Sequence, residues 1–243
     1  MIFSADFRIG FTLTNRLTEL SNKGLLTILG EIAEMHSSSV GFGVTDIYTT
    51  KLSWALLNWK VKVIKRPKYG ETITINTWAR PSNRLNVYRD FEVCDSDGNI
   101  MAIATSKWVL IDIFTHKIVK IPEELENKYN PEDKTAFDDE ESITLPKLKE
   151  IDNYTVSLYY KIRRADIDVN EHVNNLCYLD IAREILPEDD NCTVDYNEFE
   201  IMYRHQIKFE DDITVYYGID AGTHYVVVKN NSDERLHSVM KFK

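Results

Sequence analysis

The feature that most constrains the fold of this 243-residue chain is a long internal repeat. Each half reads as a leading strand, then a helix, then several strands of alternating apolar and polar residues. In the first half we predict a strand near residues 7–12, a helix at 24–35, and strands at 56–65, 71–78, 87–94, 100–105 and 106–113. In the second half we predict a strand at 154–160, a polar loop and helix within 166–186, and strands at 202–209, 213–217, 225–229 and 236–240. A repeat as long as a domain indicates a duplicated domain and not a solenoid.

An apolar helix followed by an antiparallel meander predicts an α+β fold in which the sheet wraps around the helix. Leu25, Leu29 and Ile32 lie at helical spacing, and the helix is apolar enough to need cover on most of its surface. We expect an N-terminal domain at residues 1–125 and a C-terminal domain at 151–243. Residues 126–150 are predicted to be a solvated acidic linker, because nine acidic and two basic residues lie between residues 122 and 142.

The charge of the chain limits its partners. A net charge of −10 argues against nucleic acid. Much of the excess lies in the acidic segment, and one basic cluster stands out against the nearly neutral remainder: Lys60, Lys62, Lys65, Arg66 and Lys68. Two interpretations stay open for this cluster, namely exposed residues on an alternating edge strand and a docking surface for an acidic protein.

No apolar run is long enough to cross a bilayer, and the first residues resemble neither a secretory signal nor a transit peptide. We therefore expect a cytoplasmic protein without a membrane partner. The three cysteines match no zinc spacing and form no C-x-x-C motif. Cys94 and Cys177 are predicted to be buried thiols and Cys192 an exposed, incidental one. We expect no cofactor and no metal.

Residues 166–175 contain one His, three Asn and two Asp directly before a predicted helix. Asn174 and Asn175 are ordinary capping residues, and Asn and Asp are common in turns, so the loop can be explained without chemistry. The alternative is a catalytic loop. The N–H groups at a helix start and their partial positive charge suit a developing oxyanion.

The spacing within this loop suggests how a reaction could be arranged. If the loop is extended, Asp168, Asn170 and His172 share one face, while Val169 and Val173 are the anchors. Histidine is the natural general base, because its ordinary pKa lies near neutral pH. An Asn amide can hold a water molecule or a carbonyl group, and an Asp can orient either neighbour.

The string D-x-D-V-N-x-H-V-N-N-x-x-Y, at residues 166–178, closely resembles the signature of the acyl-acyl-carrier-protein thioesterases. Further landmarks of this resemblance are the strand around Trp59 and the segments at 104–109 and 120–124. The resemblance implies two hotdog domains in tandem, each an antiparallel sheet around a central helix. It also implies hydrolysis of a fatty acyl thioester on an acidic acyl carrier protein, giving free fatty acid.

The resemblance assigns catalytic roles to Asn170 and His172 and implicates Asp168. We add Asn174 and Asn175 as substrate-binding candidates, because the first helical N–H groups could form the oxyanion site.

One segment departs from the family pattern. Where the family has a Glu followed by a Cys, on the strand after the helix, this chain has Gln206 and Ile207. No Cys–His nucleophile pair is available there, which favours direct attack by water. Gln206 can hydrogen-bond but cannot ionise, so it is a substrate-binding candidate. Should the family's Glu be the base, His172, Asp168 or Glu210 would have to replace it. His205 is expected to be structural, because it would face the opposite side of the strand.

Superposing residues 32–33 on 181–182 places Lys23 at the position of His172, so we predict that the first copy is catalytically silent. Two other functions stay open: a hotdog dehydratase or isomerase acting on acyl thioesters, and a non-catalytic acyl-binding protein. The sequence also leaves open the acyl chain length, a homodimer, and the choice between acyl carrier protein and coenzyme A.

Overall fold

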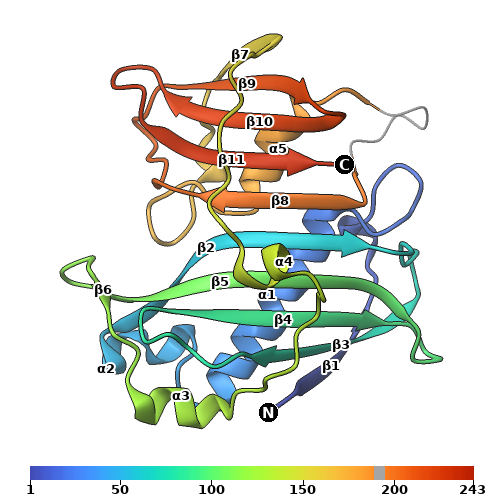
Figure 1. The fold of residues 1–243 in the computed structure, drawn as a ribbon, viewed down its shortest axis with the longest axis vertical. Helices are drawn as coiled ribbons and strands as arrows, with labels where there is room; N and C mark the ends of the chain where they lie inside the picture. Colours follow the sequence, from blue (N-terminus) through green and yellow to red (C-terminus); the bar gives the residue numbers. More distant parts are fainter. Residues whose placement is uncertain (189–194) are drawn as a thin grey trace. The chain divides into compact units, whose positions relative to one another are not determined.

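The computed structural model describes residues 1–188 and 195–243, and the chain forms two compact units. The first unit comprises Met1–Leu20 and Gly24–Pro146, and the second comprises Ser21–Lys23 and Lys147–Lys243. Each unit contains an antiparallel sheet and one main helix, which confirms the predicted α+β class (Figure 1). Within the described ranges, no helix is both long enough and apolar enough to span a membrane.

In the first unit the strand order is β1-β3-β4-β5-β2, with β6 paired to β5. The strands are β1 (Phe3–Arg8), β2 (Leu52–Val63), β3 (Thr72–Ala79), β4 (Asn86–Cys94), β5 (Ile100–Asp112) and β6 (Ile118–Val119). Helix α1 (Asn22–Ser39) lies along this sheet (Figure 1), and its Leu25, Leu29 and Ile32 are at most 2% exposed. Burying side chains of this size stabilises the fold by about 1.5–3 kcal/mol each, and the helix is therefore the centre of the core.

The second unit repeats the plan with the order β8-β11-β10-β9-β7. The strands are β7 (Val156–Tyr160), β8 (Glu198–Tyr203), β9 (Ile213–Asp220), β10 (Thr223–Asn230) and β11 (Leu236–Phe242). Its helix α5 (Cys177–Arg183) is much shorter than α1, and Tyr178 packs edge-on against Tyr203 with ring centroids 5.1 Å apart. The incoming chain crosses this sheet at Gly218, where a Cβ atom would lie 2.5 Å from the carbonyl oxygen of Asn153.

The segment predicted to be a solvated linker is packed on the first unit instead. It holds the second half of α3 (Glu123–Tyr129) and all of α4 (Glu140–Thr144). The first unit ends at Pro146, so residues 147–150 belong to the second unit. Tyr129, Phe137 and Leu145 are each at most 7% exposed. The acidic residues dominate the composition of this segment, but these apolar residues between them fix it to the unit.

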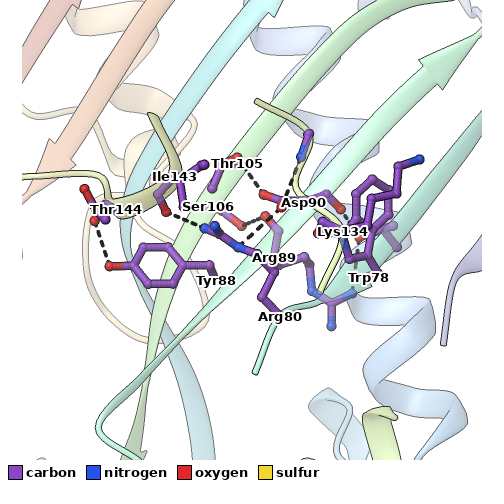
Figure 2. Close-up of polar contacts among 12 residues, drawn as sticks. Trp78, Arg80, Tyr88, Arg89, Asp90, Thr105, Ser106, Lys134, Ile143 and Thr144 are labelled. Carbon is purple, nitrogen blue, oxygen red and sulfur yellow. Dashed lines mark hydrogen bonds and ion pairs between the residues drawn. The ribbon is translucent and has the colours of Figure 1, made fainter. Parts of the chain in front are cut away.

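Polar contacts also hold this segment to β3 and β4 (Figure 2). The indole N–H of Trp78 donates to the carbonyl oxygen of Lys134 (2.7 Å), and the guanidinium of Arg80 donates to that of Ile143 (2.6 Å). Arg80 also forms an ion pair with Asp90, whose side chain is fully buried. Burial is the main cause that raises the pKa of the Asp90 carboxyl, and Arg80 opposes the rise.

Most predicted strands are confirmed, with some shifted boundaries. The leading strand β1 begins at Phe3 and not near residue 7, and residues 11–13 form a 3-10 helix in which Phe11 is 73% exposed. The two strands predicted at 100–113 are one strand, β5. Helix α1 continues to Ser39, and a short α2 (Ile47–Thr50) follows it. Cys94 and Cys177 are buried thiols, as predicted, whereas Cys192 lies outside the described residues.

Candidate active site

The polar loop of the second unit is a closed turn and not an extended segment. An isolated bridge joins Ile167 to Val173, and the N–H of Asp168 donates to the carbonyl oxygen of His172 (2.9 Å). The N–H of Glu171 donates back to the carbonyl oxygen of Asp168 (3.0 Å), and Glu171 has a φ of +62°. A left-handed residue inside the loop interrupts the alternation of faces that an extended chain would have.

This turn changes the predicted arrangement of side chains. Val173 is an anchor, at 3% exposed, but Val169 is 92% exposed at the tip of the turn, so its predicted anchoring role is wrong. Asp168 uses its carboxylate to accept the backbone N–H of Asn170 (2.8 Å), which stabilises the turn. Asn170 is exposed and His172 half-buried. The structure therefore brings these residues together through the backbone of one turn, and not as alternate residues of a single extended face.

His172 is the most distinctive side chain of the loop. It forms an isolated bridge with Lys208 through the backbone. Its imidazole Nδ1 atom is buried and has no hydrogen-bond partner among the residues that the structure describes. Buried polar atoms are nearly always hydrogen-bonded in folded proteins. In the described residues, His172 shares this exception with other buried side chains, among them His36 and His237, and it is the member that lies in the polar loop.

The helix start is largely occupied by local hydrogen bonds. The side-chain oxygen of Asn174 accepts the N–H of Leu176 (2.9 Å), and its carbonyl oxygen accepts the N–H of Cys177 (2.8 Å). Asn174 thus caps the turn that leads into α5. Asn175 is exposed, and its carbonyl oxygen accepts the hydroxyl of Tyr203 (3.1 Å). The N–H groups of Leu176 and Cys177 are already paired, which argues against the predicted oxyanion site at these two groups.

The segment that carries Gln206 runs beside the loop, although not as a strand. β8 ends at Tyr203 and the chain bends at His205. His205 therefore does not lie on a strand, and the expectation that it faces the opposite side of one is wrong. The N–H of Val173 donates to the carbonyl oxygen of Ile207 (2.8 Å), which places Gln206 next to the C-terminal end of the loop. Gln206 is exposed, whereas Ile207 is fully buried.

A buried carboxylate at the root of the loop was missed by the sequence analysis. Asp166 is 1% exposed and accepts hydrogen bonds from the Arg163 guanidinium (2.6 and 2.9 Å), the Arg163 backbone N–H (2.8 Å) and the Tyr160 hydroxyl (3.0 Å). Burial alone would raise the pKa of the Asp166 carboxyl, but the hydrogen bonds from Arg163 and Tyr160 outweigh it and lower the pKa. The pKa of Tyr160 is raised to about 12, by burial first and by Asp166 second. The signal available in the sequence was the i, i+3 spacing of Arg163 and Asp166, which allows an ion pair within one turn.

When the two units are aligned by their isolated bridges, the residue equivalent to His172 differs from the one given by superposing the helices. The bridges Thr14–Leu20 and Glu19–Lys68 of the first unit match Ile167–Val173 and His172–Lys208 of the second. His172 therefore corresponds to Glu19, and the predicted match to Lys23 is wrong by one helical turn. The superposition failed because α1 and α5 differ in length, whereas the loops are aligned by their bridges.

Two other predicted features can be placed. In the basic cluster, Arg66 donates to the carbonyl oxygen of Leu20 (3.0 Å), and the ammonium of Lys60 lies 5.7 Å from the ring centre of Phe137. Lys62 and Lys68 are exposed. Across residues 1–188 and 195–243, no three His, Cys, Asp or Glu side chains gather in a way that could hold a metal ion.

Comparison with solved structures first shows which fold the chain has. The chain aligns with the 12:0-ACP thioesterase from Umbellularia californica at a TM-score of 0.85 and 23% identity, covering 100% of this chain and 96% of the other. It aligns with an acyl-ACP thioesterase from Bacteroides thetaiotaomicron at a TM-score of 0.84 and 23% identity, covering 99% and 96%. These likenesses confirm the tandem hotdog fold.

The sequence comparison then defines the family. Residues 1–129 match the model of the acyl-ACP thioesterase N-terminal domain, and residues 148–240 match that of the C-terminal domain. The chain belongs to the acyl-ACP thioesterase family. It is 29% identical over 225 residues to an oleoyl-acyl carrier protein thioesterase of Arabidopsis thaliana, covering 86% of this chain and 59% of that relative. It is also 31% identical over 187 residues to a dodecanoyl-[acyl-carrier-protein] hydrolase of Cinnamomum camphora, covering 73% and 49%. The chain thus spans about three-fifths or less of the length of these relatives.

Proposed function

We propose that this protein hydrolyses the thioester of a fatty acyl chain carried by acyl carrier protein, releasing the free fatty acid. The observation that carries the proposal is the match of both halves, in order, to the two domains of one thioesterase family. Relatives named for oleoyl, palmitoyl and dodecanoyl carriers support the substrate class, and they span several chain lengths.

In the proposed mechanism a water molecule attacks the thioester carbonyl carbon while His172 accepts a proton from that water; the carbon–sulfur bond then breaks, and the departing thiolate takes the proton from His172. The Nδ1 atom of His172, buried and without a hydrogen-bond partner in the described residues, supports this role, because no protein group competes for that ring nitrogen. Asn170, at the exposed tip of the same turn, would hold the water or the carbonyl oxygen with its amide. Asp168 would act by fixing the turn, through its hydrogen bond to the Asn170 N–H.

We propose one reacting centre per chain. The matching turn of the first unit carries Leu17 and Glu19 where the second carries Asn170 and His172, as the shared bridges indicate. A leucine side chain can neither donate nor accept a hydrogen bond, so the first turn lacks the pair of side chains that the mechanism needs. Gln206, adjacent to the loop, would contribute a hydrogen bond to substrate and no proton.

Incubation with acyl carrier proteins bearing 8- to 18-carbon chains, and with the matching coenzyme A thioesters, tests the proposal. Release of free fatty acid and thiol is the expected result, faster on the carrier protein. Formation of an unsaturated thioester would instead indicate a dehydratase or isomerase, and binding without turnover an acyl-binding protein. Either outcome would contradict the proposed hydrolysis.

A further inference from the structure

The network that holds Asp166 is absent from the matching place in the first unit. The two places can be equated from the sheet register, since Phe7 pairs with Ile73 in the first unit and Tyr160 with Ile213 in the second. In both units a 3-10 helix follows, at Phe11–Leu13 and Arg164–Asp166. Residues Phe7, Gly10 and Leu13 therefore stand where the second unit has Tyr160, Arg163 and Asp166.

The first unit forms the same backbone turn without this polar network. The N–H of Leu13 donates to the carbonyl oxygen of Gly10 (3.1 Å), just as the N–H of Asp166 donates to that of Arg163 (3.0 Å). Side chains of Phe, Gly and Leu offer no carboxylate, guanidinium or hydroxyl group. A turn of this shape therefore does not in itself require these three polar residues.

Asp166 is connected directly to the loop that carries His172. Its carbonyl oxygen accepts the N–H of Asn174 (2.8 Å), two residues after His172, and its neighbour Ile167 bridges Val173. Both ends of the loop therefore depend on the position of one buried residue. The carboxylate is held by several charge-assisted hydrogen bonds, which are stronger and more directional than neutral ones.

We propose that Asp166, clamped by Arg163 and Tyr160, is a positioning residue that fixes the place of the turn carrying His172. The expected effect on kcat rests on the proposed hydrolytic function, whereas the expected effect on the position of His172 does not. A small displacement of a reacting group can cost up to about 100-fold in rate, and we expect a loss of roughly tenfold in kcat when the clamp is loosened. KM is expected to change by less than about twofold, because Asp166 is buried away from solvent.

The experiment compares Asp166→Asn and Tyr160→Phe with a matched control. Tyr160→Phe introduces the residue type found at position 7 and removes only a hydroxyl group, so it keeps the test available if Asp166→Asn does not fold. The control is Asp46→Asn in the first unit. The Asp46 carboxylate accepts the N–H of Gly43 (2.9 Å) at the start of the 3-10 helix Val44–Asp46. Asp166 accepts the N–H of Arg163 in the same way, but Asp46 is not connected to the loop that carries His172. Thermal unfolding of each variant establishes the folded fraction.

Two readouts separate positioning from simple stability. We expect kcat to fall in both loop variants and not in Asp46→Asn, with losses that are not additive in the double variant because both changes loosen one clamp. We also expect the imidazole NMR resonance of His172, assigned by its loss in His172→Gln, to move in both loop variants while that of His36 stays in place. An unchanged kcat or an unchanged His172 resonance in the folded variants would overturn the inference. If the wild-type protein hydrolyses no thioester, the proposed function fails, and the NMR comparison alone decides whether the clamp positions His172.

Discussion

The turn at residues 14–20 of the first unit and the turn at 167–173 of the second have the same backbone and different side chains. The N–H of Asn15 donates to the carbonyl oxygen of Glu19 (2.8 Å), as that of Asp168 does to His172 (2.9 Å). The left-handed residues, Thr18 at +60° and Glu171 at +62°, also match. The comparison teaches that this turn belongs to the fold, and that any chemistry depends on a few side chains placed on it.

The two units also differ in the helix and the buried polar residues near these turns. The first unit has an 18-residue helix, and its buried polar residues hold the segment that follows the sheet. The second unit has a seven-residue helix, and its buried carboxylate lies at the root of the polar turn. Substitutions in the first unit are therefore expected to change mainly stability, and those around the second turn to change mainly turnover.

The largest expected effect tests the second turn directly. His172→Ala and Asn170→Ala should each reduce hydrolysis about 100-fold or more, because they remove the proposed base and the proposed hydrogen-bond donor. Steady-state rates on an acyl carrier protein substrate, with circular dichroism to confirm folding, provide the measurement. Turnover close to that of the wild type in either variant would remove that residue from the mechanism.

The next effect tests the assignment of stability to the first unit. Arg80→Ala leaves the fully buried Asp90 carboxylate without its ion-pair partner and removes the hydrogen bond to Ile143. Breaking one side of a buried ion pair typically costs about 3–5 kcal/mol, so a marked loss in the free energy of unfolding is expected. Chemical denaturation measures it. If kcat of the folded fraction fell as well, the division of roles between the units would need revision.

The third prediction uses the lowered pKa of Asp166. A carboxyl group whose pKa is lower in the folded state stabilises the protein above its unfolded pKa, and that contribution is lost as the pH falls through the folded pKa. The stability difference between wild type and Asp166→Asn should therefore be constant above about pH 5 and shrink below about pH 4, where an unfolded Asp becomes protonated. Denaturation curves across this range check the sign. A difference that grew on acidification would contradict the lowered pKa.

The smallest expected effect sharpens the comparison of the turns. Glu19 occupies the place of His172 in a turn for which no chemistry is proposed, so Glu19→Ala should change kcat by less than about twofold, as is usual for a substitution away from the reacting groups. Lys23→Ala, at the position given by the superposed helices, should also have little effect. A large loss of kcat in Glu19→Ala would mean that the first turn takes part in the reaction.

Much of the fold could be predicted from local patterns. Alternating residues gave most strands of both units, the apolar helix gave α1, and the duplicated order gave two domains. The motif at 166–178 also led to the family that the comparisons identify. These signals lie within short stretches of chain, where periodicity and residue type are sufficient evidence.

The sequence by itself therefore determined the fold class, the duplication, the family and the loop that carries Asn170 and His172. Only the tertiary structure decided that the loop is a closed turn, that Glu19 is the counterpart of His172, that the acidic segment packs on the first unit, and that Asp166 is buried beneath the loop. The physical reason is that each of these depends on contacts between distant residues, such as Val173 with Ile207 and Arg80 with Ile143. No local pattern of residues specifies which distant groups will satisfy a buried carboxylate or a backbone N–H group.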